Sequence, residues 1–541
     1  MNENLFMHYR LPGGSRAELH HLFQWHIPEY FNLCSDTVER QAKLHPERLA
    51  LIEPERRRVT YAELANSASR LSSALQARGF DTGMIVAVWG EPGLELALAH
   101  LAVYRLGAIL LPLSTLFGKD AVRYRLEHAG ARIILVARQI LEERESWIED
   151  IVEHRYVLED VLEWIEATLP QPAHPTRADD PALLIYTSGT TGKPKGALLA
   201  HRTLLGHLPG FYLYSNDPAW EAVYWSPAEW AWVGGLFDVV LPAWFYGFTV
   251  LAYRGRTFDP EYALWLIEQY GVTHSFLFPT ALKILRATGK KPERHRLKSI
   301  HSGGEVLGAE MEAWSREVFG LPINEFYGQT EANLLIGNSF VRDPIKPGSM
   351  GPAYPGHRVV LMREDGSFAG VGEPGEIALA LPDPVAFLGY WNNVEATQEK
   401  IKDGWLRTGD LAVRDEDGYF WYMSRADDVI NTAGYRLGPH EIESAIMQDE
   451  AVSMAAVVGA PDAVRGEKIV AFICLKGSYD ERSQDDLENI AHRLRMLVRE
   501  TVGHHAYPRE IIFADDLPLT PTGKLMRTKL KELAEGKGKI Y

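Results

Sequence analysis

Short apolar runs alternate with stretches of helical periodicity through most of the chain. Apolar residues fill positions 85–88 just before a helical pattern at 94–104, and positions 133–136 just after another at 122–128. An unbroken apolar run of four residues is typical of a strand buried on both faces, whereas apolar residues three and four positions apart are typical of a one-sided helix. The alternation therefore predicts an α/β fold in layers, with largely parallel sheets.

The pattern changes near residues 425–428, where we place a domain boundary. After a strand-like segment at 418–422, it predicts a strand starting at 429–430, a helix over 439–448 with Ile442, Ala445 and Ile446 on one face, and strands over 453–458 and 468–475. A chain of 541 residues exceeds what one hydrophobic core usually supports. We expect a large N-terminal domain of layered α/β subdomains at 1–426 and a small mobile α+β domain at 427–541.

Composition narrows the classes of function. The formal net charge is −16, so the chain lacks the basic surface that nucleic-acid binding needs. Its two cysteines, Cys34 and Cys474, have no metal-ligand spacing and fit a reducing compartment. The start has no apolar signal segment, and the most apolar stretch, 239–253, is too short to span a bilayer. We expect a cytoplasmic protein with no nucleic-acid or membrane partner.

The most informative stretch is the loop at 186–196, Tyr-Thr-Ser-Gly-Thr-Thr-Gly-Lys-Pro-Lys-Gly, between two apolar runs that predict strands. Glycines let successive backbone N–H groups turn toward one anion, and hydroxyls and lysines add further donors. A Walker A loop needs Ser or Thr after its Gly-Lys pair, whereas Pro194 follows Lys193 here. A plain glycine-rich hairpin needs neither both lysines nor all the hydroxyls. The loop therefore predicts a polyphosphate site of another kind.

Further polar patches follow along the chain. A glycine pair at 303–304 lets a flat ring lie on bare backbone. Glu331 could hold a hard cation that bridges phosphates, and Asp410 could accept hydrogen bonds from the two hydroxyls of a ribose. Lys524 lies on a loop framed by prolines, a threonine and a glycine. Taken one at a time, each of these patches can also be explained as a turn, a solvated carboxylate or a surface lysine. Their combination and order argue against these explanations.

In this order the motifs resemble those of the adenylate-forming superfamily of acyl-CoA synthetases, adenylation domains and luciferases. The resemblance runs from about Phe31 to Arg527, and segments 425–443 and 461–467 are most similar to medium-chain acyl-CoA synthetases, with acetyl-CoA synthetase a near relative. It implies a carboxylic acid as substrate and ATP, Mg²⁺ and coenzyme A as cofactors. The acid would attack the α-phosphate of ATP to give an acyl-adenylate and pyrophosphate, and CoA would then displace AMP.

The resemblance also implies roles for the matching residues of the nucleotide site. The β- and γ-phosphates would be cradled by Thr187, Ser188, Gly189, Thr190, Thr191 and Lys195. Adenine would lie against Gly303, Gly304 and Glu305. The site would be completed by Glu325 at the adenine amino group and by Phe326, Tyr327, Gly328 and Gln329. Asp410 and Arg425 would grip the ribose.

Four residues match the family's catalytic positions: Thr330 at the α-phosphate, Glu331 as the Mg²⁺ ligand, Arg436 at a phosphate, and Lys524 between the carboxylate and the α-phosphate. For the second step, Ala433 and Gly434 would line the pantetheine tunnel and Arg499 would contact the CoA phosphate. Asp427 matches the hinge about which the small domain would rotate between the two steps.

Two positions depart from the family pattern. Ser424 stands where the family often has glycine. Gly328 stands where acetate-specific members carry a tryptophan that closes the acyl pocket, so we expect room for short- to medium-chain, branched or aromatic acids. The opposite wall would be formed by Trp230, Ala231 and Trp232, and Trp232 could shorten the pocket that Gly328 lengthens.

Several alternatives stay open. They are an acetyl-CoA synthetase, an enzyme that loads a carrier protein in trans, a luciferase-like oxygenase and a non-catalytic nucleotide sensor. A sensor needs neither a hinge at Asp427 nor a lysine at 524, so the sequence favours an enzyme. The pattern also leaves open a homo-oligomer, and a lysine acetyltransferase and deacetylase acting on Lys524. Pro518, six residues upstream of that lysine, suggests such regulation by resemblance to regulated relatives.

Overall fold

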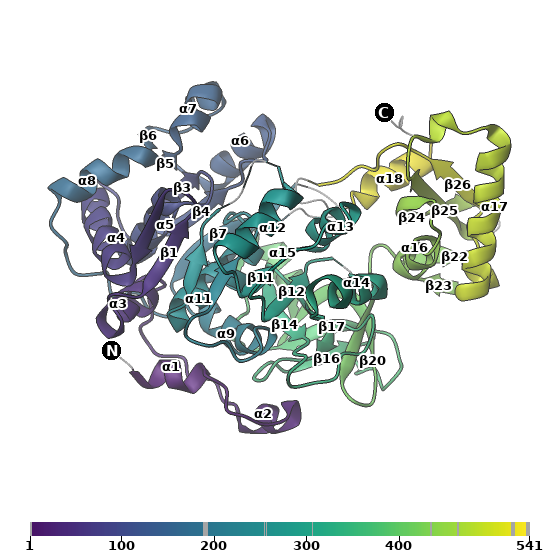
Figure 1. Ribbon diagram of the computed structural model, residues 1–541, viewed down its shortest axis with the longest axis horizontal. Coiled ribbons are helices and arrows are strands. Elements are labelled where there is room, and N and C mark those ends of the chain that lie inside the picture. Colours follow the sequence, from purple (N-terminus) through teal and green to yellow (C-terminus); the bar gives the residue numbers. More distant parts are fainter. Residues whose placement is uncertain are drawn as a thin grey trace.

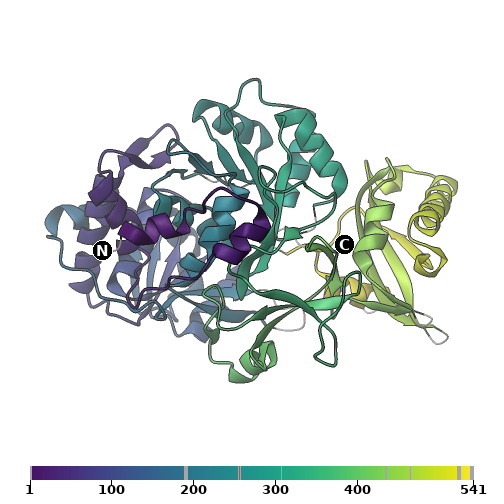
Figure 2. The ribbon, with the colours of Figure 1, turned by 90° about the horizontal axis from the view of Figure 1, so that it is seen from below.

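The computed structural model describes residues 3–187, 193–253, 255, 257–305, 307–432, 435–462, 465–520 and 525–536. A large body carries a smaller unit, built from the last part of the chain, at one end (Figures 1 and 2). The predicted α/β class is confirmed, together with its large N-terminal and small C-terminal domains. Several predicted site residues, namely Ser188, Gly189, Thr190, Thr191, Ala433, Gly434 and Lys524, lie outside the described residues.

A seven-stranded sheet forms one half of the body, in the order β18-β8-β7-β4-β3-β5-β6. Its strands are β3 (Ile85–Trp89), β4 (Ile109–Leu113), β5 (Ile133–Val136), β6 (His154–Val157), β7 (Pro181–Thr187), β8 (Lys195–Ala200) and β18 (Gly389–Tyr390). The β3, β4, β5, β6 and β7 neighbours pair in parallel, as predicted. β7 and β8 pair antiparallel, with Thr187 opposite Lys195. The predicted phosphate loop therefore joins two adjacent strands.

An eight-stranded sheet forms the other half, in the order β14-β13-β12-β11-β9-β10-β1-β2. Its strands are β1 (Leu49–Glu53), β2 (Arg57–Thr60), β9 (Val223–Trp225), β10 (Thr249–Leu251), β11 (His274–Phe276), β12 (Ser299–Gly303), β13 (Ile323–Gln329) and β14 (Ala332–Gly337). β12 and β13 run parallel, with Ser302 opposite Glu325 and Gly303 opposite Phe326. Two sequence motifs about twenty residues apart are thus brought side by side at the same edge.

The third sheet is antiparallel throughout, so the prediction of largely parallel sheets is wrong for this part. It contains β15 (Gly351–Pro352), β16 (Val359–Met362), β17 (Gly375–Ala380), β19 (Ile401–Lys402), β20 (Trp405–Arg414) and β21 (Tyr419–Arg425). β20 and β21 follow each other through a short turn, and antiparallel neighbours need no crossover helix. Their register sets Asp410 opposite Arg425.

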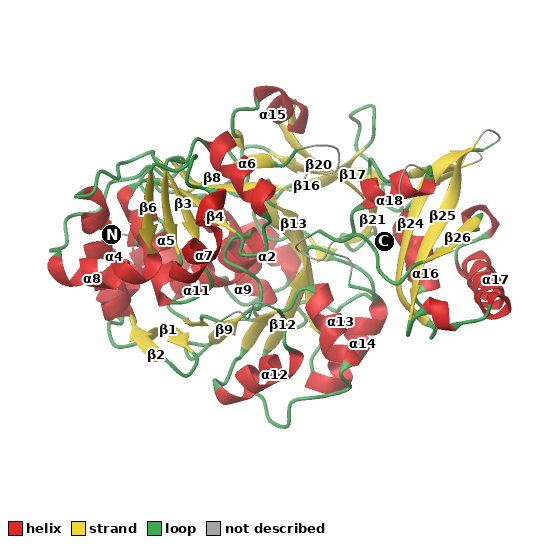
Figure 3. Cartoon of the chain, turned by 90° about the horizontal axis from the view of Figure 1, so that it is seen from above, coloured by secondary structure: helices red, strands yellow, loops and turns green. Residues whose placement is uncertain are grey.

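The small C-terminal unit has its own sheet and core. Its strands are β22 (Ile430–Thr432), β23 (Tyr435–Leu437), β24 (Val452–Asp462), β25 (Gly466–Leu475) and β26 (Glu510–Phe513), with helices α16 (Pro439–Ile446), α17 (Gln484–Thr501) and α18 (Arg527–Ala534). Ile442, Ala445 and Ile446 are buried on one face of α16, as predicted. In every view α17 lies on the side away from the large body (Figures 1 to 3).

Helices cover the sheets of the body (Figure 3). They are α1 (Glu3–Tyr9), α2 (Arg16–Leu22), α3 (Arg40–Leu44), α4 (Tyr61–Gln76), α5 (Leu94–Leu106), α6 (Lys119–Ala129), α7 (Arg138–Arg144), α8 (Val161–Ala167), α9 (Thr203–Tyr214), α10 (Val233–Gly235), α11 (Leu241–Tyr246), α12 (Pro260–Gln269), α13 (Pro279–Ala287), α14 (Ala309–Phe319) and α15 (Val394–Lys400). Two π-helices, η1 (Ser35–Glu39) and η4 (Leu236–Val240), run directly into α3 and α11.

The apolar stretch at 239–253 is core, as expected. It covers the end of η4, all of α11 and β10, and its aromatic residues Trp244, Phe245 and Tyr246 are fully buried. Within the described ranges, helices that combine the length and apolarity needed to cross a membrane are absent. Cys34 and Cys474 are both buried free thiols.

Candidate active site

A large cleft lies where the sheets of the body meet the C-terminal unit. Its volume is about 3420 Å³, and both units contribute lining residues. Sixteen of the residues predicted from the sequence line it: Thr187, Lys195, Gly303, Gly304, Glu305, Glu325, Phe326, Tyr327, Gly328, Gln329, Thr330, Glu331, Asp410, Arg425, Asp427 and Trp232. Trp232 lies directly before α10, and the others come from β7, β8, β12, β13, β20 and β21 and the turns beside them, so the fold gathers motifs from more than two hundred positions of sequence into one cavity.

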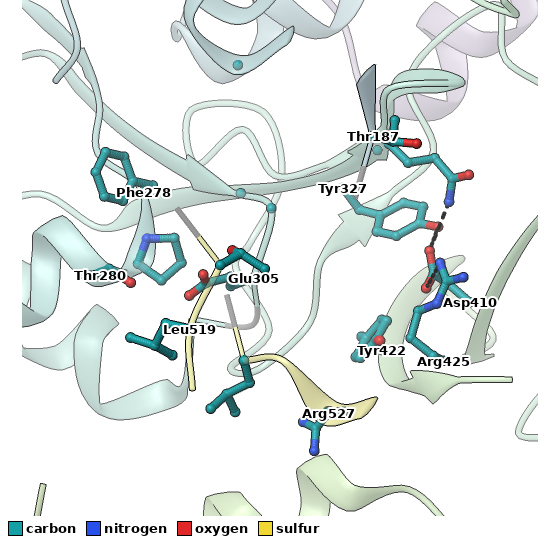
Figure 4. A pocket seen from close by; sticks show the side chains of 18 of the residues that line it. Thr187, Phe278, Thr280, Glu305, Tyr327, Asp410, Tyr422, Arg425, Leu519 and Arg527 are labelled. Atoms are coloured by element: carbon teal, nitrogen blue, oxygen red, sulfur yellow. Dashed lines mark hydrogen bonds and ion pairs between the residues drawn. The ribbon is translucent and has the colours of Figure 1, made fainter. Parts of the chain in front are cut away.

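Asp410 is the centre of a dense group of hydrogen bonds on one side of this cleft (Figure 4). Its Oδ2 accepts from the Tyr327 hydroxyl at 2.6 Å and from Gln329 Nε2 at 3.0 Å. Its Oδ1 faces Arg425 Nη1 at 3.3 Å. Burial, and then the neighbouring Asp410, raise the pKa of Tyr327, so its hydroxyl stays a donor. The carboxylate is thereby fixed in place while still lining the cavity.

Glycine at 409 allows this arrangement. Gly409 has φ +78°, and a Cβ there would lie 3.2 Å from Arg425 Nη2. Its backbone N–H donates to Glu376 Oε1 at 2.8 Å. A side chain at this position would strain the backbone and press on the arginine that faces Asp410.

Glu331 is buried beside the predicted phosphate loop. It is 6% exposed, and its Oε1 accepts from the Tyr390 hydroxyl at 2.5 Å. Lys195 Nζ lies 5.2 Å from the centroid of the Tyr390 ring, within the range of a cation–π contact. Tyr390 therefore links the last lysine of the loop to the carboxylate.

The donor set around Glu331 fits a magnesium ion. Clusters of three or more histidine, cysteine, aspartate or glutamate side chains able to hold a metal are absent from the described part of the chain. Mg²⁺ commonly takes only one or two protein carboxylates and completes its shell with waters and substrate phosphates. A single oriented carboxylate next to a phosphate loop meets that requirement.

Gly303 and Gly304 form a bare shelf next to Phe326. A Cβ at Gly303 would lie 2.7 Å from the Phe326 ring, and Gly304 has φ +89°. Glu305 lies across the cavity from Asp410, near Thr280 and Leu519 (Figure 4). Phe326 fills the space beside Gly303, so only a glycine fits there, and the positive φ of Gly304 is a conformation that favours glycine.

Glu325, on the strand beside this shelf, is buried, and burial raises its pKa from 4.5 to about 8. Between those values the folded protein keeps a proton that the unfolded chain has released. The protein should therefore lose stability as pH rises from about 5 to 8, by at most about 1.4 kcal/mol per pH unit.

We expect Glu325→Gln to remove this loss. The difference in melting temperature between variant and wild type should grow in the variant's favour from about pH 5.5 to about pH 7.5, because the amide cannot ionise. Thermal unfolding followed by circular dichroism measures this difference in melting temperature. Glu317→Gln, on the exposed face of α14, is the control. A constant difference across that range would contradict the buried, protonated state.

The described residues on either side of Lys524 lie at the cleft. Leu519 and Leu525 pair as an antiparallel bridge, and Met526 N–H donates to Pro518 O at 2.9 Å. Leu519, Thr520 and Leu525, on either side of residues 521–524, line the cavity. The ends of the predicted catalytic loop are thus held at the cleft that contains Asp410 and Glu331.

Charged side chains form ion pairs and a hydrogen bond at the boundary between the two units. Arg425 Nε lies 3.4 Å from Asp427 Oδ1, and Lys531 Nζ donates to Asp427 O at 2.9 Å. Arg527 contacts Asp428 at 3.5 Å and Glu443 at 2.7 Å. These contacts hold α18 against the connection between β21 and β22. The boundary at residue 427 and its role as a hinge stay predictions.

The prediction of open space beside Gly328 is wrong, because that space is filled. A Cβ at Gly328 would lie 2.5 Å from Asn333 Oδ1 and 2.4 Å from the backbone nitrogen of Leu334. The two residues belong to β14, which pairs with β13 through a register shift between Tyr327 and Gln329. Across the hairpin, Asn333 fills the position that Gly328 leaves vacant. A tryptophan at 328 would collide with main chain, so Gly328→Trp is not a clean test of pocket depth.

The wall predicted at 230–232 is also corrected in part. Trp230 is 5% exposed and packs in the core, with ring centroids 6.4 Å from His100 and 6.1 Å from Trp244. Trp230 and Ala231 are not among the residues that line the cleft, whereas Trp232 is. Trp232 Nε1 donates to Glu229 Oε2 at 3.3 Å, which fixes the orientation of the indole.

Two further predicted residues, Arg499 and Arg436, belong to the C-terminal unit. Arg499 is in the last turn of α17, where its Nε lies 3.1 Å from His504 Nε2, and it does not line the cleft. Arg436 lies in β23, and its backbone is paired with Asn431.

Several residues that line the cavity were not predicted from the sequence. Lys400, at the end of α15, donates to Thr408 O at 2.8 Å, and burial lowers its pKa. Tyr390 contacts Glu331, and Asp238 and Asn333 line the wall near Gly328. None of these residues belongs to a motif of glycines or hydroxyls. Their positions depend on how separate strands and helices pack.

Comparison with known proteins agrees with this geometry. A family model described as "AMP-binding enzyme" matches residues 38–391, and one described as "AMP-binding enzyme C-terminal domain" matches residues 441–524. An uncharacterized acyl-CoA ligase of Bacillus subtilis (strain 168) is 33% identical, over 88% of this chain and 90% of its own. The acetyl-coenzyme A synthetase of the same organism is 32% identical, over 92% of this chain and 90% of its own.

Solved structures give the same result. The anthranilate CoA ligase in complex with anthranoyl-AMP superposes with a TM-score of 0.85 at 28% identity, covering 94% of this chain and 98% of that one. The o-succinylbenzoate coenzyme A synthetase from Bacillus subtilis with ATP and magnesium ion has a TM-score of 0.78 at 26% identity, over 91% and 98% of the two chains. The resemblance found in the motifs is confirmed: the chain belongs to the AMP-binding enzyme family, and acyl-CoA ligases and synthetases are among its relatives.

Proposed function

We propose that the protein is an ATP-dependent acid–thiol ligase that converts a carboxylic acid into its acyl-CoA, with release of AMP and pyrophosphate. The observation that carries the proposal is the grouping of the Asp410 hydrogen bonds, Glu331 and the ends of the Lys524 loop around one cleft. Its relatives named as acyl-CoA ligases support the same activity.

The first step would join the acid to the nucleotide. A carboxylate oxygen forms a bond to the α-phosphorus of ATP while the bond from that phosphorus to the bridging β-oxygen breaks, giving acyl-adenylate and pyrophosphate. Asp410 would accept hydrogen bonds from the ribose, the glycine shelf would carry adenine, and Lys195 and its loop would contact the outer phosphates. Glu331 would hold Mg²⁺, which when bound offsets phosphate charge.

The second step would transfer the acyl group. The sulfur of CoA bonds to the acyl carbon, the carbon–oxygen bond to AMP breaks, and the thiol proton is released. Ala433, Gly434 and Arg499 are proposed to serve this step after rotation of the small unit about Asp427. The position of Arg499 on the outer helix α17 is compatible with a CoA nucleotide bound at the surface.

A screen of pyrophosphate release tests the proposal. Purified protein with ATP and Mg²⁺ should release pyrophosphate with at least one of acetate, propionate, butyrate, branched acids, hexanoate, octanoate and benzoate, and AMP release should then depend on CoA. AMP release that needs a carrier protein instead of CoA would favour the carrier-loading alternative. Nucleotide binding with no pyrophosphate release from any acid would overturn the proposal in favour of a sensor.

A further inference from the structure

A buried carboxyl group forms part of the cleft wall on the side of Asn333 and Gly328. Asp238 lies in the π-helix η4 (Leu236–Val240), is 2% exposed and lines the cavity. π-helical turns are rare and occur frequently at functional sites, because they turn a side chain out of the regular helical positions. An acidic side chain is rarely buried unless it is paired or hydrogen-bonded.

One oxygen of this carboxyl group is held by a polar network. Asn333 Nδ2 donates to Asp238 Oδ1 at 2.6 Å and lies 3.1 Å from His207 Nε2. His207 Nδ1 lies 2.7 Å from Thr203 O, and burial lowers the pKa of His207 to about 3, so the ring is neutral. Because a carbonyl oxygen only accepts, Nδ1 carries the ring hydrogen and Nε2 accepts from Asn333. Both amide hydrogens of Asn333 are therefore used inside the network.

The other oxygen faces the cavity. Within the described parts of the chain, Asp238 Oδ2 has no hydrogen-bond partner. A Cβ placed on Gly234 would lie 3.8 Å from Oδ2, so the bare backbone of that glycine leaves the approach open. The surrounding wall is apolar and includes Phe276, Phe326 and Val233. A purely apolar acyl chain in this space would leave the oxygen buried without a partner, which weakens binding.

We propose that Asp238 is a specificity residue and that the acid substrate carries an amino or hydroxyl group that hydrogen-bonds to its Oδ2. This inference rests on the proposed ligase function and names the substrate class of that same cleft. An amine or hydroxyl fits either protonation state of the carboxyl, because each can donate its own hydrogen and also accept one. A ketone or ether oxygen can only accept, so it fits the protonated carboxyl alone, and a methyl group can do neither.

Burial also raises the pKa of Asp238, which favours the protonated carboxyl in the empty pocket. An aryl amine or a hydroxyl binds without any proton transfer. An aliphatic ammonium group binds with loss of the carboxyl proton to solvent and forms a buried ion pair. Comparing amino-substituted with hydroxy-substituted acids distinguishes binding without proton transfer from binding as a buried ion pair.

The test compares kcat/KM for pyrophosphate release across matched acids. Benzoate is compared with its amino, hydroxy, acetyl and methyl derivatives at each ring position, and butyrate with its 3-hydroxy, 3-amino, 3-oxo and 3-methyl derivatives. We expect the best amino or hydroxy acid to exceed its methyl analogue by about 10² or more, as in sites built to hydrogen-bond a substrate group. Asp238→Asn should lower that ratio by about 10-fold or more, with the KM for ATP unchanged.

Two further variants separate recognition from packing. Gly234→Ala keeps the carboxyl but places a methyl group 3.8 Å from Oδ2 and 3.0 Å from the Phe276 ring, so it should lower the same ratio by crowding the approach to the carboxyl. Val239→Ala, in the same π-helix but not lining the cleft, should leave the ratio unchanged.

The possible outcomes distinguish failure of the Asp238 proposal from failure of the proposed ligase function. Equal rates with methyl and amino or hydroxy acids, a preference for the oxo acids, or an unchanged ratio in Asp238→Asn would overturn the role of Asp238 while leaving the ligase function intact. Absence of pyrophosphate release with every acid would overturn the ligase function itself.

Discussion

Lys524→Ala should abolish most of the adenylation activity while leaving thioester formation from supplied acyl-adenylate largely intact. A lysine between the carboxylate and the α-phosphate would stabilise charge that develops in the first transition state only. Loss of one such preorganised donor costs about 10²–10³ in rate. The described ends of its loop, Thr520 and Leu525, lie at the cleft that holds Asp410 and Glu331, which supports this role.

Single-turnover assays of the two half-reactions measure the effect. Lys529→Ala, on the exposed face of α18, controls for loss of a positive charge in the same unit. Equal loss in both half-reactions would contradict the proposal that the unit presents Lys524 for the first step alone. Acetylation of Lys524 should act like the alanine variant, because it removes the charge. Full activity of stoichiometrically acetylated protein would exclude that route of regulation.

Asp427→Pro should affect the other half-reaction: it should slow thioester formation rather than adenylation. A proline fixes φ near −65° and restricts the residue before it, so rotation about this position would be hindered. A misplaced proline costs about 3 kcal/mol, and the same penalty on the rotated state would slow thioester formation by about 10². Adenylation should survive, since Thr520 and Leu525, on either side of residues 521–524, already line the cleft in this arrangement.

Asp427→Ala is the matched control, because it removes the contact with Arg425 but keeps φ free. Pre-formed acyl-adenylate mixed with CoA reports the second step separately from the first. Normal rates of both steps in the proline variant would place the hinge at another residue. Slowing of thioester formation by the alanine variant to the same extent would assign the effect to the carboxylate instead.

Much of the site was predictable because its motifs are local. The loop at 186–196 lies between adjacent strands, so glycines, hydroxyls and lysines close in sequence are also close in space. Residues 303–305 begin at the end of β12 and residues 325–331 run along β13 into the turn after it, and these two strands pair in parallel, so their ends meet at one edge. Asp410 and Arg425 are neighbours through a single turn between two strands.

The shape of the acyl pocket was not predictable in this way. The sequence placed Gly328 in the pocket wall and indicated open space, but whether a glycine leaves space depends on what lies opposite. A register shift in the β13–β14 hairpin brings Asn333 against it. The same packing joins Asn333 to Asp238 and His207, which are 95 and 126 positions away in the chain.

The amino-acid sequence by itself therefore determined the family, the layered α/β class and the groups that would hold the nucleotide. Each of these depends on residue types at short, fixed spacings. Only the tertiary structure decided which side chains share the cleft wall, that Trp230 lies in the core, and that Asp238 Oδ2 has no hydrogen-bond partner among the described residues. Side-chain contacts between distant segments follow from strand register and helix packing, and neither leaves a periodic mark along the chain.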